Sequence, residues 1–110
     1  MARTKPHSPY VKDAARLLGE QIRAARRARG WSQQELADRA GIAAPTLRKV
    51  EYGDLGVALG TAFEVAALTG VPLFYDDRVR LSMDLDRTQA RSALLPKRVP
   101  TRRGQVRDDF

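Results

Sequence analysis

Apolar residues recur at helical spacing in four stretches of this 110-residue chain. The first stretch covers 11–28, the second follows Ser32, the third covers about 44–52 and the fourth starts at Leu59. Their apolar positions are, in order, Ala14, Leu18, Ile22 and Ala25; Leu36, Ala37 and Ala40; Leu47 and Val50; and Leu59, Ala62, Phe63, Ala66 and Ala67. The pattern predicts four consecutive helices and an all-α fold.

Glycines and a capping motif predict where these helices begin and end. A glycine in the left-handed conformation commonly closes a helix, and a glycine follows each stretch at positions 30, 41, 53 and 70. Ser32 and Glu35 have the spacing of a capping box. Trp31 and Leu36 have that of a hydrophobic staple. We therefore expect the second helix to begin directly after Ser32.

The other segments carry weaker patterns. Residues 71–75 form a short apolar run that contains a proline, which predicts an edge strand. Residues 78–86 alternate as a strand would, but Leu81, Leu85 and Thr88 also have helical spacing, and good helix formers follow. We expect a flexible arm at 1–9, a domain at 10–77, an additional helix at 78–95 and a disordered basic tail at 96–110.

Composition excludes several classes of function. The chain has no cysteine and one histidine, His7, so disulfides, cysteine-bound zinc and paired-histidine chemistry are excluded. It shows no nucleophile–base pair and no phosphate-binding glycine loop, so we expect neither an enzyme nor a cofactor. No apolar run approaches the roughly 20 residues of a membrane helix, so we expect a cytoplasmic protein with no membrane partner. The formal charge of +7 suggests nucleic acid or an acidic partner, although five basic and no acidic residues fall at 97–107, where a solvated tail would explain them.

The segment from Ser32 to Gly53 has the features of a helix-turn-helix that binds DNA. It combines a small residue at Ala37, a turn glycine at Gly41 and an apolar underside on the third helix. Some of these features also occur in a three-helix bundle without a ligand. The outward positions of the third helix are Ala44, Pro45, Arg48, Lys49 and Tyr52.

These residues resemble the Xre/Cro-repressor family over 18–75. The matching positions are Ser32-Gln33, Leu36-Ala37, Gly41-Ile42, Thr46-Leu47 and Glu51-x-Gly53. The resemblance implies a small lambda-repressor-like bundle of four or five helices. It also implies a homodimer that binds a palindromic operator in double-stranded DNA.

The resemblance further implies roles for individual residues. Ser32 and Gln33 would donate to backbone phosphates at the start of the second helix. Ala44, Pro45 and Lys49 occupy positions that face base edges. Arg26 and Glu51 match an ion pair that joins the first helix to the third. The expected DNA-binding residues are thus Ser32, Gln33, Ala44, Pro45, Thr46, Arg48, Lys49 and Tyr52.

The chain departs from the family pattern at the start of the third helix. Ala43 stands where the family often has serine or threonine, so this helix lacks its usual N-cap. Ala44 and Pro45 replace a polar pair that often reads bases, and they can only touch a thymine methyl. Base reading then depends on Lys49 and Arg48, with part of the discrimination coming from DNA shape. A phosphate contact or a solvated side chain is the alternative for Lys49.

The run 59–77 resembles the end of a HipB-type antitoxin, in which a short strand pairs with its two-fold mate. This implies a dimer contact through Val71, Leu73 and Tyr75. The alternative is that Val71, Leu73 and Phe74 close the core beneath the first helix.

The tail, basic and then ending in Asp108-Asp109-Phe110, resembles small regulators that accompany HipA-like kinase toxins. A DNA-following arm and a tail with no partner are its alternatives. The leading hypothesis is an antitoxin that represses its own operon. A stand-alone repressor and a protein-interaction module are the alternatives.

Overall fold

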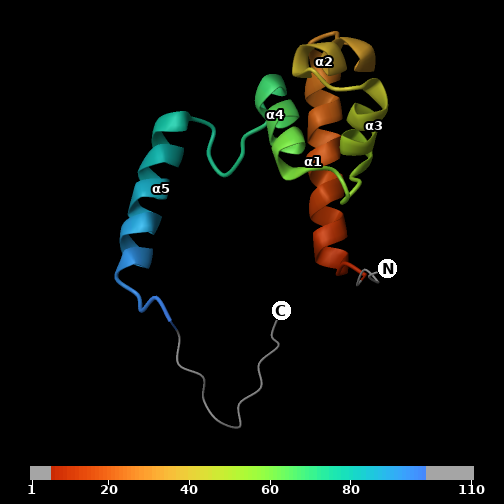
Figure 1. The fold of residues 1–110 in the computed structure, drawn as a ribbon. Helices are drawn as coiled ribbons and strands as arrows, with labels where there is room; N and C mark the ends of the chain where they lie inside the picture. The colour runs from red at the N-terminus through yellow and green to blue at the C-terminus, as the bar shows by residue number, and fades with distance from the viewer. Residues whose placement is uncertain (1–5, 99–110) are drawn as a thin grey trace. The chain divides into compact units, whose positions relative to one another are not determined.

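The computed structural model describes residues 6–98, which contain five helices (Figure 1). The helices are α1 (Pro9–Ala28), α2 (Gln33–Ala40), α3 (Ala44–Tyr52), α4 (Leu59–Thr69) and α5 (Arg78–Ala93). The all-α prediction is confirmed, and the ambiguous segment 78–86 is helical. The chain divides into two compact units between Asp77 and Arg78. Residues 1–5 of the predicted arm and 99–110 of the predicted tail lie outside the described residues.

Helices α1 to α4 enclose one hydrophobic core. α1 packs against α3 and α4, and α2 packs against the same two helices. The buried apolar residues of the core are Ile22, Leu36, Ala37, Leu47, Val50, Val65, Ala66 and Val71. Every one of the four helices contributes to this set, so the orientation of α3 is fixed from below by the rest of the bundle.

The boundaries of α2 and α3 follow from local signals. The Ser32 hydroxyl accepts from the Glu35 N–H at 3.0 Å, and the Glu35 carboxylate accepts from the Ser32 N–H at 2.8 Å. The glycines that follow α2 and α3 adopt the left-handed conformation, with φ of 70° at Gly41 and 82° at Gly53. Ala43 caps α3 with no side-chain hydrogen bond. The capping box expected at the start of α2 is therefore present, and α3 lacks a side-chain N-cap, as expected.

α1 and α3 touch backbone to backbone at Gly19. An ideal Cβ built on this residue would lie 2.5 Å from the Glu51 carbonyl oxygen and 2.7 Å from that of Val50. Real Cβ atoms essentially never approach so closely. Glycine at this position therefore sets the separation of the two helices.

The buried face of α4 differs from the apolar stripe expected there. Leu59 is 68% exposed and Ala67 is also exposed, whereas Val65, Ala66 and Thr69 are buried. The Thr69 hydroxyl donates to the Val65 carbonyl at 2.9 Å, which lets this polar residue enter the core. Apolar residues occupy nearly every side of α4, so spacing alone could not identify the side that packs on α1 and α2.

The predicted edge strand over 71–75 does not form. The Tyr75 N–H donates to the Leu73 carbonyl at 2.7 Å, and Phe74 between them has φ of 71°, which makes a tight γ-turn. Residues 6–98 contain only an isolated bridge between Leu73 and Tyr75 and no second strand for this segment to join. Val71 is instead buried in the core, as the alternative interpretation expected, whereas Phe74, which that interpretation also placed in the core, is 82% exposed.

Candidate nucleic-acid interface

α2 and α3 form the helix–turn–helix unit, joined by a turn at residues 41–43. The Ile42 N–H donates to the Ala37 carbonyl at 3.0 Å, which closes the end of α2 behind the left-handed Gly41. α3 then begins at Ala44 with Pro45 in its first turn, where a missing N–H costs no hydrogen bond.

The exposed side of α3 presents a row of four predicted residues. Pro45, Arg48, Lys49 and Tyr52 are all exposed, and together with Asp54 they line a shallow hollow of about 340 Å³. Their spacing of three and four residues places them on one side of the helix. We call Pro45, Arg48, Lys49 and Tyr52 the outer row of α3. It carries two cations, which can bind phosphates or base edges, and a tyrosine that is 80% exposed. This combination is typical of a nucleic-acid-binding surface.

The other predicted DNA-binding residues lie beside this row or at the start of α2. Ala44 and Thr46 are half-buried, and Ala44 packs partly against the core. Ser32 is exposed, and its oxygen already accepts the Glu35 N–H. Gln33 is half-buried, and its side-chain amide donates to a Glu51 carboxylate oxygen at 3.1 Å. The start of α2 is thus linked directly to α3.

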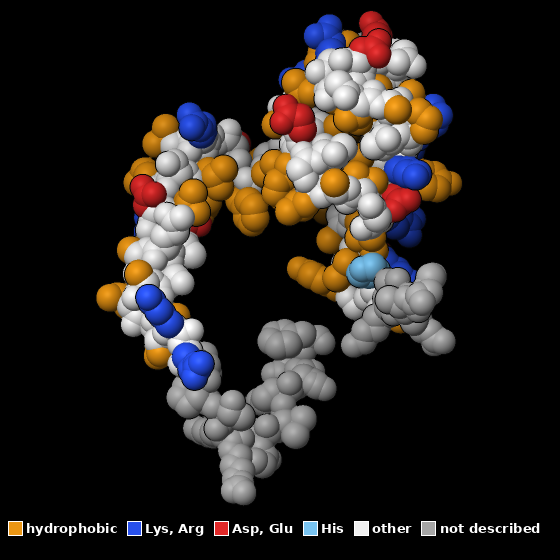
Figure 2. All heavy atoms as spheres, viewed as in Figure 1, with side chains coloured by type: hydrophobic (Ala, Val, Ile, Leu, Met, Phe, Trp, Pro, Cys, Tyr) orange, Lys and Arg blue, Asp and Glu red, His pale blue; other side chains and the backbone are white. Residues whose placement is uncertain are grey.

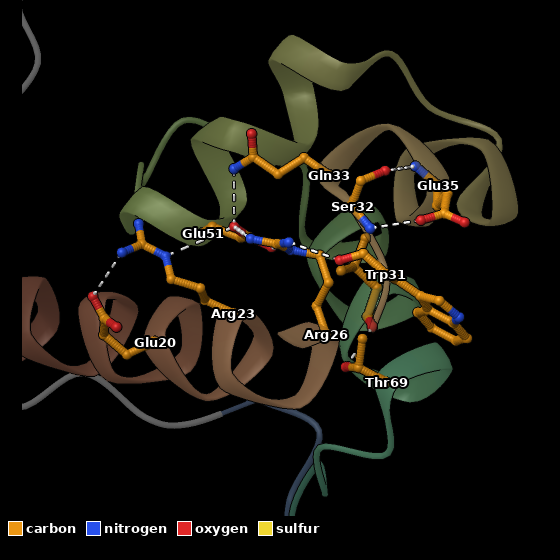
Figure 3. A network of polar contacts seen from close by, with 10 residues as sticks. Glu20, Arg23, Arg26, Trp31, Ser32, Gln33, Glu35, Glu51 and Thr69 are labelled. Atoms are coloured by element: carbon orange, nitrogen blue, oxygen red, sulfur yellow. Dashed lines mark hydrogen bonds and ion pairs between the residues drawn. The ribbon is translucent and has the colours of Figure 1, made fainter. Parts of the chain in front are cut away.

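Glu51 is the centre of a buried polar network (Figure 3). Its side chain is fully buried and forms a bidentate ion pair with Arg26. Arg26 Nε donates to Glu51 Oε2 at 2.7 Å, and Arg26 Nη2 donates to Oε1 at 3.1 Å. The third nitrogen of Arg26, Nη1, donates to the Trp31 carbonyl at 2.9 Å. The structure therefore places Arg26 and Glu51 as the pair that the family resemblance implies, and one guanidinium ties α1, α3 and the entry to α2 together.

A second arginine of α1 flanks this network. The Arg23 guanidinium lies 3.8 Å from Glu51 and 3.7 Å from Glu20, and Figure 3 shows it reaching along α1 between the two carboxylates. Arg23 and Gln33 were not predicted as partners of Glu51. Arg26 itself carries a signal in the sequence, because it follows Ile22 by four residues and so falls on the inward side of α1.

Two further arginines surround the ring of Trp31. The Arg39 guanidinium lies 4.3 Å from the ring centroid and that of Arg29 lies 5.5 Å from it. Arg29 also donates to the Thr69 carbonyl at 2.7 Å, at the end of α4. These contacts, together with the partial packing of Trp31 against the core, hold the residue that precedes α2 against the bundle.

The three residues expected at a dimer contact lie in different environments. Val71 is 7% exposed and belongs to the core, and Leu73 packs partly against that core. Tyr75 is half-buried. The same segment carries Phe74, whose side chain is 82% exposed.

The described part of the chain offers neither a metal site nor a membrane-spanning helix. Residues 6–98 contain no group of three histidine, cysteine, aspartate or glutamate side chains arranged to hold a metal ion. None of the helices described is long and apolar enough to cross a membrane.

The comparison with protein families agrees with this geometry. Residues 22–75 match the family model described as Helix-turn-helix. The match begins at the core residue Ile22, includes α2, α3 and α4, and ends at Tyr75, the last residue of the γ-turn. A search of curated proteins finds no match to the chain.

Proposed function

We propose that the protein is a DNA-binding transcriptional regulator that represses transcription as a homodimer on a palindromic operator. The match of residues 22–75 to the Helix-turn-helix family supports the DNA-binding part of this proposal. The observation that carries this proposal is the outer row of α3, which projects from a helix fixed by the core and by the buried Arg26–Glu51 pair. A two-fold dimer would place one such helix in each of two successive major grooves.

The proposed contacts divide between bases and phosphates. Lys49 and Arg48 are the side chains of the outer row that can donate to base edges, and guanine is their usual acceptor. Ala44 and Pro45 offer only apolar contact with thymine methyl groups. Ser32 and Gln33 lie at the start of α2, where the N–H groups of the first turn favour a phosphate. Thr46 is proposed to contact the DNA through its hydroxyl from the first turn of α3. Tyr52 is proposed to contact the DNA from the end of α3.

Binding measurements on duplex DNA test this function. We expect the protein to prefer a palindrome, selected from a random pool, over unrelated duplex by about 4 kcal/mol or more. The affinity for both should decrease steeply with salt, because bound phosphates release counterions. Equal binding to all sequences at every salt concentration would argue for a general DNA-binding or protein-interaction module instead.

Replacing Lys49 by alanine separates base reading from phosphate binding. If Lys49 reads a base, the Lys49→Ala variant loses about 1–3 kcal/mol on the selected palindrome and much less on random duplex. Fluorescence anisotropy titrations on both duplexes measure the difference. Lys12→Ala serves as the matched control, because Lys12 is an exposed lysine on the first turns of α1 and does not belong to the outer row of α3. An equal loss on every duplex would make Lys49 a phosphate contact.

We further propose that the regulator is the antitoxin of a type II toxin–antitoxin pair, acts in the cytoplasm and represses its own operon. The support is the composition of the tail 96–110, in which a basic stretch precedes Asp108-Asp109-Phe110, a segment suited to a HipA-like kinase toxin. All but residues 96–98 of this tail lie outside the described residues. Co-purification should recover the product of a neighbouring gene, and truncation after Leu95 should abolish the recovery. A protein that recovers only itself and its promoter would be a stand-alone repressor.

A further inference from the structure

Within its own compact unit, α5 is a helix with no buried face. None of its residues is buried, and its apolar side chains are exposed, with Leu81 at 39% and Leu85 at 53%. One more turn follows it, closed by the Leu95 N–H donating to the Ser92 carbonyl at 3.1 Å, and Leu95 is 63% exposed. Figure 2 shows hydrophobic side chains on the surface of this unit. A helix of about 16 residues is marginal in water by itself, so α5 requires a partner surface.

The side chains of α5 and of the turn that follows it define one continuous seam. We give this name to Leu81, Leu85, Thr88, Ser92 and Leu95, which are separated by four, three, four and three residues. That alternation is the spacing of positions that face a partner helix in a coiled coil. Val79 and Met83 lie on the opposite side of the helix from the seam. The seam is apolar at both ends and has small polar residues in between.

We propose that the seam binds a second copy of α5, antiparallel and centred on Thr88. This inference deepens the proposed homodimer and rests on it, since it names the element through which the two copies associate. In this arrangement Leu81 of each copy packs against Leu95 of the other at both ends. Leu85 of each copy faces the small Ser92 of the other, which fills the layer with one large and one small side chain.

Charge complementarity selects the antiparallel direction. Asp84 and Arg91 are seven residues apart and lie on the same flank of the seam. Within its own helix Asp84 also lies 3.7 Å from Arg87, so the contact with Arg91 of the other copy would add to an existing ion pair. When two copies run antiparallel, Asp84 of each copy faces Arg91 of the other, so that two ion pairs of opposite charge form across the seam. When they run parallel, Asp84 lies beside the uncharged Gln89 of the other copy, and the polar Ser92 residues of the two copies face each other in place of Leu85.

Single cysteines test this geometry directly, because the natural chain contains none. The Thr88→Cys protein should form a disulfide-linked dimer under mild oxidation, since the two Thr88 positions lie at the two-fold axis. The Leu81→Cys protein should remain unlinked. Its two cysteines would be about 21 Å apart, fourteen residues of helix, while a disulfide needs Cα atoms within about 7 Å. Met83→Cys is the matched control on the opposite side of α5.

The outcomes of the cross-linking experiment distinguish the inference from the proposed function. Cross-linking of Thr88→Cys alone supports the antiparallel seam. Cross-linking of Leu81→Cys would show parallel helices and overturn it. Absence of cross-linking in a protein that still sediments as a dimer would also overturn it, and would leave the homodimeric repressor intact. A protein that is monomeric and binds a single half-site would contradict both.

Charge reversal tests the same register without cysteine. Asp84→Arg should weaken dimerisation about tenfold or more, because two attractions become repulsions. Arg91→Asp should do the same, and the double variant Asp84→Arg/Arg91→Asp should restore dimerisation, as judged by sedimentation equilibrium. Asp86→Arg, on the side of Met83, is the matched control and should have little effect. Failure of the double variant to restore dimerisation, as expected if a different protein occupies the seam, would overturn the inference.

Discussion

Replacing Gly19 by alanine is expected to destabilise the protein by about 3 kcal/mol or more. The added methyl group would lie 2.5 Å from the carbonyl oxygen of Glu51, and this neighbour is backbone, which cannot rotate away as a side chain would. Relief requires α1 and α3 to separate. Separation opens the core around Ile22 and Val50 and stretches the Arg26–Glu51 pair, so the cost of packing and that of the ion pair add.

Urea unfolding followed by Trp31 fluorescence measures this loss, since Trp31 is the only tryptophan and is held against the bundle. The matched control is Gly60→Ala in the first turn of α4, where a new Cβ would meet nothing within 4 Å. Because alanine has the higher helix propensity, the control should be neutral or slightly stabilising. Equal midpoints for the two variants would show that α1 and α3 do not approach each other at Gly19 as described.

Replacing Glu51 by glutamine is expected to cost about 3–5 kcal/mol of stability. The amide has nearly the shape of the carboxylate, so the packing is kept and the charge alone is removed. Arg26, whose side chain is only 9% exposed, would then hold an uncompensated charge with little access to water. The amide can also present only one oxygen, whereas the carboxylate accepts from Arg26 with both and from Gln33 as well.

The same unfolding measurement on two companion variants shows whether the stability lost in Glu51→Gln comes from the unpaired buried charge of Arg26. Glu20→Gln removes a carboxylate that is 65% exposed and 3.7 Å from Arg23, and should change the stability by less than about 1 kcal/mol. The double variant Arg26→Met/Glu51→Leu removes both charges and should recover much of the loss. If Glu51→Gln were as stable as Glu20→Gln, the buried pair would not hold α3 in place.

Features that depend on neighbours in the chain could be predicted from the sequence. The capping box of Ser32 and Glu35 spans three residues, and Gly41 and Gly53 end helices through their own backbone conformations. Once Leu47 and Val50 are assigned to the underside of α3, helical periodicity alone places the outer row on the opposite side. The helix–turn–helix scaffold is encoded locally for this reason.

Features that depend on segments distant in the chain could not be predicted in the same way. Gly19 looks like an ordinary poor helix former, and only the carbonyls of α3 explain why it is needed. The segment 71–75 has the composition of a strand, but a strand forms only beside another, and the described residues supply none. The partners of Glu51 on α1 and α2 are 25 and 18 residues away, and no local spacing specifies them.

The hydrogen bond from Gln33 to Glu51 has a consequence for the entropy of DNA binding. A glutamine on a helix surface samples several rotamers, and ordering such a side chain on binding costs about 0.5–1.5 kcal/mol. Here the buried carboxylate has already selected one rotamer. The amide nitrogen carries a second N–H, which remains for a phosphate oxygen while the first stays on Glu51. Part of the side-chain entropy that Gln33 would lose in the proposed phosphate contact is thus already lost during folding. The buried Glu51 carboxylate causes this loss without itself contacting DNA.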